Sequence, residues 1–264
     1  MSSSRFSRIV RGGLLSALAL GIATTTAPTG AFAAGDGGPL VDFRSFNGAS
    51  KMLDRNGSAD ILISGRQHQR VLRLTTGGYR QAGSAWAKSK IDLSQSFEST
   101  FKVYLHHAAP GADGIAFLVQ TDGPRALGGW GGGIGYRGIK HSVAVEFDTF
   151  KNSADQGSTD PDGNHLAVVL GGNPDVHAAI GTPSIALYGK PFQARVSYDA
   201  ATQNLSVYVK ALRAGATEEL VLQHTVDLAA AAGGSSAWIG FTGGTGTDLS
   251  KQDIYSWSVQ GAEA

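Results

Sequence analysis

The ten residues V-A-V-E-F-D-T-F-K-N, positions 143–152, have the alternating pattern of a strand that is buried on one face. Successive side chains of an extended strand point to opposite sides, so one face is apolar from Val143 to Phe147. The other face carries Glu146 and Asp148. Two carboxylates two residues apart on one face repel each other unless a cation lies between them. The stretch therefore predicts a β-strand that holds acidic side chains around a bound cation.

Three further side chains of metal-ligand type follow the acidic pair: Asn152, Asp160 and His165. Carboxylates, amide oxygens and backbone carbonyls suit calcium, whereas carboxylates combined with an imidazole suit manganese or a similar first-row ion. The residues thus predict a site for one ion or for two; the alternative is an acidic loop with solvated charges and an unrelated histidine. The transition-metal set comprises Glu146, Asp148, Asp160 and His165, and the calcium set Asp148, the Phe150 carbonyl, Asn152 and Asp160.

The first 33 residues have the features of an export signal. Three arginines lie within the first 11 residues, an apolar stretch follows over residues 14–23, and residues 31–33 read A-F-A, a small-x-small cleavage site. The apolar stretch is too short to span a bilayer, which needs about 20 residues. We therefore expect residues 1–33 to be a signal peptide, no membrane span, and a secreted, extracellular protein.

Composition restricts the classes of partner. The chain has 22 Lys and Arg against 21 Asp and Glu, and removal of the signal peptide takes away three arginines, which leaves 19 basic residues. No basic patch dominates, which argues against nucleic acid or an anionic membrane surface as partner. An exported chain without cysteine has no disulfides, so its core and bound metal must stabilise it. Residues 34–264 have the length of one large β domain.

Short β-rich segments separated by turn-rich stretches recur through this domain. Only residues 228–232 suggest a helix, and it is brief. Many antiparallel strands with few helices predict an all-β fold, a sandwich of two sheets. The predicted strands cover residues 40–46, 59–64, 70–75, 97–105, 114–120, 142–150, 165–170, 185–187, 192–198, 205–209, 219–226, 238–241 and 254–259.

The order of these segments resembles the legume-type (L-type) lectins, in particular their exported bacterial relatives. The likeness rests on A-D-G-I-A-F at 112–117, G-G-G-I-G-Y at 131–136, the acidic strand with D-P-D-G-N-H at 160–165, and I-G-F-T-G-G-T-G at 239–246. It covers essentially all of the mature chain. The resemblance implies a concanavalin-like jelly-roll β-sandwich that binds Ca²⁺ and Mn²⁺, or an ion similar to Mn²⁺. It also implies glycans, as mono- or oligosaccharides, as partners, and a homodimer formed through sheet edges as one candidate assembly.

The resemblance also gives roles to three polar or small residues. Asp113 matches an aspartate that follows a cis peptide bond and accepts hydrogen bonds from two sugar hydroxyls. Asn152 matches an asparagine that calcium fixes and that donates a hydrogen bond to the sugar. Gly132 matches a glycine whose N–H reaches the sugar, and a side chain there would occupy the place of the sugar.

An aromatic residue and a variable loop complete the expected sugar site. Phe150 matches the aromatic side chain that packs on the apolar face of the pyranose. Thr247 and Asp248 match the loop that sets specificity, and Trp130 would close the glycine loop or stack on a second sugar unit. Solvated or core positions are expected for four other histidines that have no match, His106, His107, His141 and His177.

Two alternatives compete with a lectin. Laminarinase-type glycosidases share a related sandwich and carry Glu-x-Asp-x-x-Glu on one strand, where the two glutamates act as nucleophile and acid/base. Here Lys151 occupies the position of the second glutamate, so that mechanism cannot run and no enzyme is expected. The other alternative is a structural or adhesive surface module with a decayed sugar site. The retention of Asp113, Gly132 and Asn152 argues against decay.

Overall fold

The structure is a computed structural model that describes residue 1 and residues 40–261 except 65–67 and 109–110. The chain divides into two units, Met1–Ala33 and Ala34–Ala264, and the fold described here is that of the second. The signal peptide predicted over residues 1–33 lies outside the described residues, apart from Met1. Among the helices of the described residues, none is long and apolar enough to cross a membrane.

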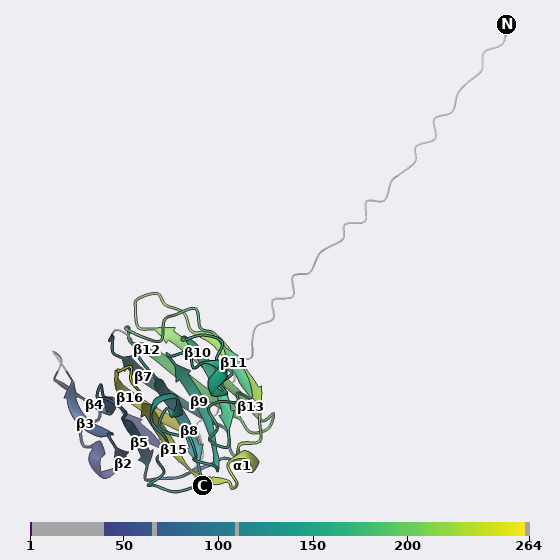
Figure 1. Ribbon diagram of the computed structural model, residues 1–264. Coiled ribbons are helices and arrows are strands. Elements are labelled where there is room, and N and C mark those ends of the chain that lie inside the picture. The colour runs from purple at the N-terminus through teal and green to yellow at the C-terminus, as the bar shows by residue number, and fades with distance from the viewer. Residues whose placement is uncertain (2–39, 65–67, 109–110, 262–264) are drawn as a thin grey trace. The chain divides into compact units, whose positions relative to one another are not determined.

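Two antiparallel sheets of eight strands each make up the domain, so the predicted all-β sandwich is confirmed (Figure 1). The β7 sheet has the order β14 (Glu219–Thr225), β13 (Asn204–Ala211), β12 (Phe192–Asp199), β7 (Phe97–Leu105), β16 (Lys251–Gly261), β4 (Gln69–Thr76) and β3 (Asp60–Ser64), with β1 (Val41–Phe43) paired to β16. The β9 sheet has the order β11 (Ala179–Gly181), β10 (His165–Leu170), β9 (Ser142–Asp148), β8 (Gly114–Gln120), β15 (Ser236–Gly244), β5 (Ala82–Ala87) and β2 (Leu53–Gly57), with β6 (Ile91–Asp92) paired to β15.

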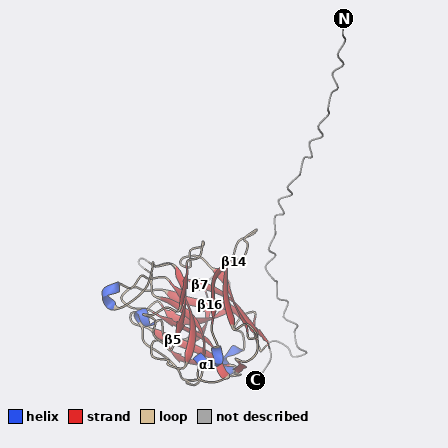
Figure 2. Ribbon diagram, turned by 90° about the vertical axis from the view of Figure 1, so that its right-hand side faces the viewer, coloured by secondary structure: helices blue, strands red, loops and turns tan. Residues whose placement is uncertain are grey.

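Helical structure is sparse and lies at the periphery of the strands (Figure 2). The described residues contain one short α-helix, α1 (Leu228–Ala231), where the sequence suggested one. Its N-cap is Asp227, whose side chain accepts a hydrogen bond of 2.9 Å from the Ala230 N–H. Three 3₁₀ turns are η1 (Ala49–Lys51), η2 (Gly131–Gly133) and η3 (Ala154–Gln156).

Aromatic side chains fill the core between the two sheets. Phe101 of the β7 sheet lies with its ring centroid 5.6 Å from Phe117, 5.7 Å from Phe147 and 4.9 Å from Phe241. Trp257 packs edge-on to Phe241 at 4.9 Å. All five side chains are buried, and such pairs stabilise beyond the burial of their apolar area. This core supplies the rigid support on which the loops at the strand ends are held.

Strand β9 has the two faces that its sequence predicts. Val145 and Phe147 point into the core between the sheets, whereas Glu146 and Asp148 lie on the opposite face and are also buried. The register of the neighbouring strands places His165 of β10 opposite Asp148 and pairs the start of β8 with the same end of β9. Residues that are distant in the sequence therefore meet at one end of the β9 sheet.

Several strands differ from the prediction. Residues 185–187 are not a strand among the described residues, although the neighbouring Tyr188 makes a single parallel bridge to Leu105. The sequence pattern also missed β2, β5, β6 and β11. Strand β5 reads A-G-S-A-W-A, and five of its six residues are buried, so it has no polar face to create an alternation.

A buried ion pair in the β7 sheet yields a first prediction. Asp253 is fully buried and accepts hydrogen bonds of 2.7 and 2.8 Å from Arg73 and of 2.8 Å from His106. Burial raises the pKa of Asp253, but these two partners outweigh burial, and the pKa is lowered. Asp253→Ala leaves Arg73 and His106 without their acceptor and is expected to reduce the free energy of unfolding by about 3 kcal/mol, measured by urea denaturation at pH 7.

The matched control is Asp42→Ala, which breaks an exposed pair with Arg44 at 4.0 Å and should cost less than about 0.5 kcal/mol. Because the pKa of Asp253 is lower in the folded state, its contribution is present above pH about 4 and is lost as the pH falls below that value. The difference in free energy of unfolding between the wild type and Asp253→Ala should therefore become smaller below pH about 4. If Asp253→Ala and Asp42→Ala lose equal amounts of unfolding free energy at pH 7, the pair between Asp253 and Arg73 has no special structural role.

Candidate functional site

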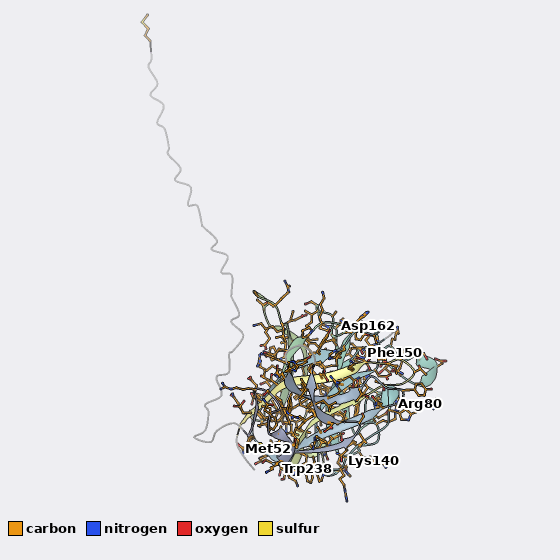
Figure 3. The ribbon with its side chains drawn as sticks, turned by 90° about the vertical axis from the view of Figure 1, so that its left-hand side faces the viewer. Met52, Arg80, Lys140, Phe150, Asp162 and Trp238 are labelled. Atoms are coloured by element: carbon orange, nitrogen blue, oxygen red, sulfur yellow. The ribbon has the colours of Figure 1, made fainter. Side chains whose placement is uncertain are left out.

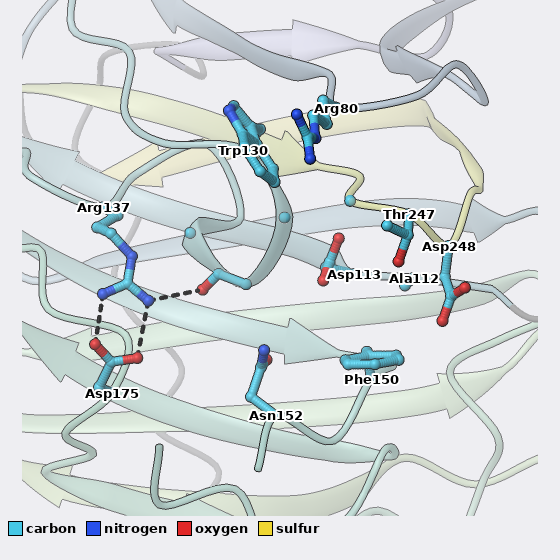
Figure 4. A pocket seen from close by; sticks show the side chains of 14 residues that line it. Arg80, Ala112, Asp113, Trp130, Arg137, Phe150, Asn152, Asp175, Thr247 and Asp248 are labelled. Carbon is cyan, nitrogen blue, oxygen red and sulfur yellow. Dashed lines mark hydrogen bonds and ion pairs between the residues drawn. The ribbon is translucent and has the colours of Figure 1, made fainter. Parts of the chain in front are cut away.

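One cavity of about 510 Å³ is lined by all six residues that were predicted to bind the sugar. Asp113 directly precedes β8, Gly132 lies in η2, and Phe150 and Asn152 follow β9. Figure 4 shows the side chains of Asp113, Phe150 and Asn152 around a common space. In Figure 3 Phe150 lies at the end of the domain away from Met52. The loop between β15 and β16 contributes the remaining two predicted residues, Thr247 and Asp248.

Asp113 presents a buried carboxylate to this cavity. The peptide bond between Ala112 and Asp113 is cis, as the resemblance implied. The residue is only 4% exposed, and its Oδ2 atom has no hydrogen-bond partner in the structure. Burial, and secondly the charge of Asp248, raise the pKa of Asp113 to about 7, against the opposing effect of the Gly246 N–H. A buried acceptor without a donor is costly, so this atom is suited to hydroxyl groups of a ligand.

The backbone around Asp113 is fixed by hydrogen bonds from two other loops. Its N–H donates to the Gly244 carbonyl at 3.0 Å. Its carbonyl accepts from the Thr149 N–H at 2.9 Å and from the Thr149 hydroxyl at 3.0 Å. Because Thr149 directly follows β9, the position of Asp113 is tied to the acidic strand.

The structure adds a second reason for a glycine at position 132 to the one expected from the sugar. A Cβ at this position would lie 2.7 Å from Nδ2 and 2.9 Å from Oδ1 of Asn152. Such contacts are shorter than van der Waals distance, so any side chain at position 132 displaces the Asn152 amide. The glycine therefore allows the η2 turn and the Asn152 side chain to approach each other at the floor of the cavity.

The sequence did not predict three charged residues that line the cavity: Arg80, Arg137 and Asp175. The Arg80 guanidinium lies over the Trp130 ring, 4.7 Å from its centroid, at the rim. Arg137 donates from both terminal nitrogens to the Asp175 carboxylate, and a terminal nitrogen also reaches the Gly132 carbonyl at 3.5 Å (Figure 4). No local pattern signals this pair, because its partners come from two loops that are separate in the sequence.

The four residues of the predicted transition-metal set lie close together and are hydrogen-bonded, through Asp148 and Asp160, to the loop that lines this cavity. Donor atoms of Asp148, Asp160 and His165 lie within 4.8 Å of one another. Glu146 is 1% exposed and contributes a second, overlapping group with His165. Burial, followed by the charges of Glu146 and Asp160, raises the pKa of Asp148 well above its usual range. The repulsion that the sequence predicted between these carboxylates is therefore present.

The predicted calcium residues are joined to the same carboxylates through the backbone. Asp148 accepts a hydrogen bond of 2.7 Å from the Phe150 N–H, and Asp160 Oδ2 accepts one of 2.7 Å from the Asn152 N–H. The loop after β9 thus wraps around these two acidic side chains. As a result, Phe150 and Asn152 connect the acidic cluster to the cavity.

His177 also lies in the acidic cluster. Its side chain is buried, which agrees with the core alternative expected for it, but the sequence did not indicate the carboxylates that surround it. Its side chain is 1% exposed, and Nε2 lies 3.4 Å from Glu146 Oε2 and 3.6 Å from Asp160 Oδ1. Burial lowers the pKa of His177, but the Glu146 and Asp160 carboxylates outweigh burial and raise it. The residue comes from the loop between β10 and β11, where the sequence has no periodicity to place it.

The donor set fits divalent cations. Three buried atoms of this cluster have no hydrogen-bond partner in the structure: Glu146 Oε2, His165 Nε2 and His177 Nε2. Buried polar atoms are nearly always satisfied, and a cation bound at this cluster would satisfy all three atoms. Imidazole nitrogen beside carboxylates suits a first-row transition metal, whereas carboxylates with the amide of Asn152 suit calcium.

Comparison with known proteins agrees with this architecture. The family model of the legume lectin beta-barrel domain (lectin, L-type) matches residues 45–258. A lectin of Onobrychis viciifolia is 34% identical over 187 residues, which cover 66% of this chain and 71% of that protein. A probable L-type lectin-domain containing receptor kinase I.2 of Arabidopsis thaliana is 27% identical over 81% of this chain. The matched region spans 35% of the receptor kinase, so the chain corresponds to about a third of its length.

Solved structures share the fold. Lectin I-B4 of Griffonia simplicifolia, in a metal-free form, is similar with a TM-score of 0.71 and 22% identity, over 84% of this chain and 98% of that chain. The lectin of Bauhinia forficata in complex with GalNAc is similar with a TM-score of 0.69 and 26% identity, over 84% and 97%. These similarities confirm the jelly-roll β-sandwich, and the match of the family model extends over most of the described domain. The chain belongs to the legume lectin (L-type) family.

Proposed function

We propose that this chain is an exported lectin that binds a monosaccharide unit of a glycan and requires bound calcium and a manganese-like ion. The sugar would lie among Asp113, Gly132, Phe150 and Asn152. The rim residues Thr247 and Asp248 would adjust which sugar is preferred. The proposed signal peptide, residues 1–33, would be removed on export and leave residues 34–264 as the lectin domain.

The observation that carries this proposal is the carboxylate of Asp113, which lines the cavity with Phe150 and Asn152 and whose Oδ2 atom has no hydrogen-bond partner. A carboxylate accepts hydrogen bonds from two adjacent hydroxyl groups, as sugars offer. The Phe150 ring gives an apolar surface for sugar C–H groups. The Bauhinia forficata lectin, similar in fold, was solved with GalNAc, which supports a sugar as the ligand class.

Divalent ions would neutralise the acidic cluster and hold its loop in one conformation. Glu146, Asp148, Asp160 and His165 would hold the transition-metal ion, and Asp148, the Phe150 carbonyl, Asn152 and Asp160 the calcium. Asp160 supports this division, because its Oδ1 faces the histidines and its Oδ2 faces the Asn152 N–H. The ordered Asn152 amide would then donate to the sugar while Asp113 accepts.

A glycan array screened with and without Ca²⁺ and Mn²⁺ tests the proposal. We expect binding to a restricted set of glycans, lost without the ions, with a single-site dissociation constant on the order of 1 mM. A homodimer would raise the apparent affinity on multivalent surfaces. Hydrolysis of a β-glucan that disappears in Glu146→Gln would instead support a glycosidase. That alternative has little support here, because exposed Lys151 occupies the position of the acid/base.

Gly132→Ala tests the floor of the sugar site. The new methyl group would displace the Asn152 amide, since its Cβ would lie 2.7 Å from Nδ2. Only the end of the Asn152 side chain must move, but that side chain is also a proposed calcium ligand, so the midpoint of thermal unfolding is measured in saturating Ca²⁺, where it should change little. Loss of one sugar hydrogen bond, worth about 1 kcal/mol or more, is expected to weaken binding by about tenfold, measured by isothermal titration calorimetry.

Gly129→Ala is the matched control in the same loop. Its Cβ would lie 3.6 Å from Arg137 Cβ, an ordinary van der Waals contact, and would not approach Asn152. This variant should bind sugar as the wild type does. If both alanine variants keep full affinity, the approach of η2 to Asn152 does not matter for binding.

A further inference from the structure

His177 reaches the acidic cluster from a direction that the predicted ligand set does not include. It lies in the loop between β10 and β11, and its ring centroid is 5.6 Å from that of His165. Its Nε2 atom is 3.4 Å from Glu146 Oε2 and 3.6 Å from Asp160 Oδ1. Donors that share one ion through bonds of about 2.1 Å lie about 3.0–3.4 Å apart. Small movements would therefore let His177 bind the same ion as Glu146 and Asp160.

The unsatisfied atoms of the cluster define a common centre. One donor atom each of Glu146, His165 and His177 lies within 4.8 Å of the other two. Glu146 Oε2, His165 Nε2 and His177 Nε2 are each buried without a hydrogen-bond partner in the structure. The other oxygen of Glu146 accepts a hydrogen bond from the Tyr136 hydroxyl. That bond leaves Oε2 directed towards the two imidazoles.

The outer nitrogen of each imidazole is held by an oxygen atom. Nδ1 of His165 lies 2.8 Å from the Asp162 carbonyl. Nδ1 of His177 lies 3.0 Å from the Thr159 hydroxyl, which itself donates to the Asp175 carbonyl at 3.2 Å. Because that hydroxyl proton is already used, His177 must donate from Nδ1. With an ion bound, both rings would keep the proton on Nδ1 and turn the Nε2 lone pair to the centre, as metal-bound histidines do.

We propose that His177 is a direct ligand of the transition-metal ion, so that the site contains two imidazoles. This rests on the metal centre of the proposed function and adds a residue to it. A second imidazole favours zinc, cobalt or nickel over manganese, which prefers oxygen donors. The ion at this site in this chain is therefore zinc-like, bound by a set that comprises Glu146, Asp148, Asp160, His165 and His177.

Competition between two ions tests the selectivity. The full chain is stripped of metal, saturated with Ca²⁺, incubated with equal concentrations of Zn²⁺ and Mn²⁺, and desalted for elemental analysis. Most sites with nitrogen and oxygen ligands bind zinc more tightly than manganese. The informative quantity is therefore the change in the ratio of bound zinc to bound manganese that the substitution causes. His177→Ser is expected to lower this ratio by about 10–100-fold. The control His141→Ser removes an exposed histidine paired with Asp122 and should leave the ratio unchanged.

A count of the nitrogen ligands tests coordination directly. With Mn²⁺ bound, electron spin-echo envelope modulation distinguishes one coordinated imidazole from two. We expect two in the wild type and one in His177→Ser. One imidazole in the wild type, or an unchanged zinc-to-manganese ratio in a folded His177→Ser protein, would overturn the proposal.

The two proposals fail in different ways. If only one imidazole binds but sugar binding still depends on the ions, His177 is not a ligand and the proposed lectin function stands. If the stripped chain takes up neither Zn²⁺ nor Mn²⁺ in the presence of Ca²⁺, the metal centre itself is refuted, together with both proposals.

Discussion

Stripping the protein of divalent ions with EDTA is expected to lower the midpoint of thermal unfolding by about 10–20 °C and to abolish sugar binding. Ions that bind only the folded state stabilise it by about 3 kcal/mol each at concentrations of about 100 times their dissociation constants. Their loss leaves Glu146, Asp148 and Asp160 to repel one another in a buried cluster. The loop that carries Asn152 is attached to Asp160 and would lose its fixed position.

Differential scanning calorimetry and titration calorimetry on one preparation measure both effects. EDTA that has been saturated with Ca²⁺ and Mn²⁺ beforehand is the control for the chelator itself, and re-addition of the two ions should restore the midpoint and the binding. Sugar binding that persists in protein shown by elemental analysis to be free of metal would contradict a role of the ions in ordering the site.

Asp113→Asn is expected to weaken sugar binding by at least about 100-fold while stability does not fall. The amide keeps the shape of the side chain but accepts at one oxygen only. Hydrogen bonds to a charged group contribute about 1.5–3 kcal/mol each, so the loss of two of them is enough to make millimolar binding undetectable.

The sign of the stability effect follows from the pKa. Burial and Asp248 raise the pKa of Asp113 from 3.8 to about 7 in the folded protein. The ionised carboxylate therefore destabilises the fold increasingly as the pH rises from about 4 through 7, and at pH 8 the neutral amide removes this cost. Urea denaturation at pH 8 should give a free energy of unfolding equal to or above that of the wild type.

Asp122→Asn is a remote control for the exchange of a carboxylate for an amide, since Asp122 pairs with the exposed His141 away from the cavity. It should bind sugar normally. If Asp113→Asn loses stability and binding in parallel, the carboxylate is needed for folding, and its assignment to the sugar is incorrect.

Strands with one polar face could be predicted from the sequence, and those without one could not. Strand β9 alternates because its outer face holds Glu146 and Asp148, so periodicity identified it and its chemistry together. Strand β5 is lined by small residues, with Trp86 its one large side chain, and is buried on both faces, so its position follows from packing between β15 and β2. Short edge strands such as β11 depend on their neighbour in the same way.

In the candidate site, too, some residues could be predicted from the sequence and others could not. Glu146, Asp148 and His165 could be grouped because two lie on one strand and the third follows in a motif of known order. His177 could not be grouped with them, since only the path of the loop after β10 brings it to Glu146. A buried partner of this kind has no local signature; its presence is decided by tertiary structure.

The pair between Arg137 and Asp175 has a consequence for the recognition surface. Asp175 lies two residues before His177, and Arg137 also reaches the Gly132 carbonyl. The Arg137 guanidinium thus connects the glycine turn η2 to the segment that bears His177. A more rigid segment around His177 therefore also restricts the movement of the glycine turn. A variant without the Arg137 side chain would keep the metal ligands but would hold the turn at the edge of the cavity less firmly.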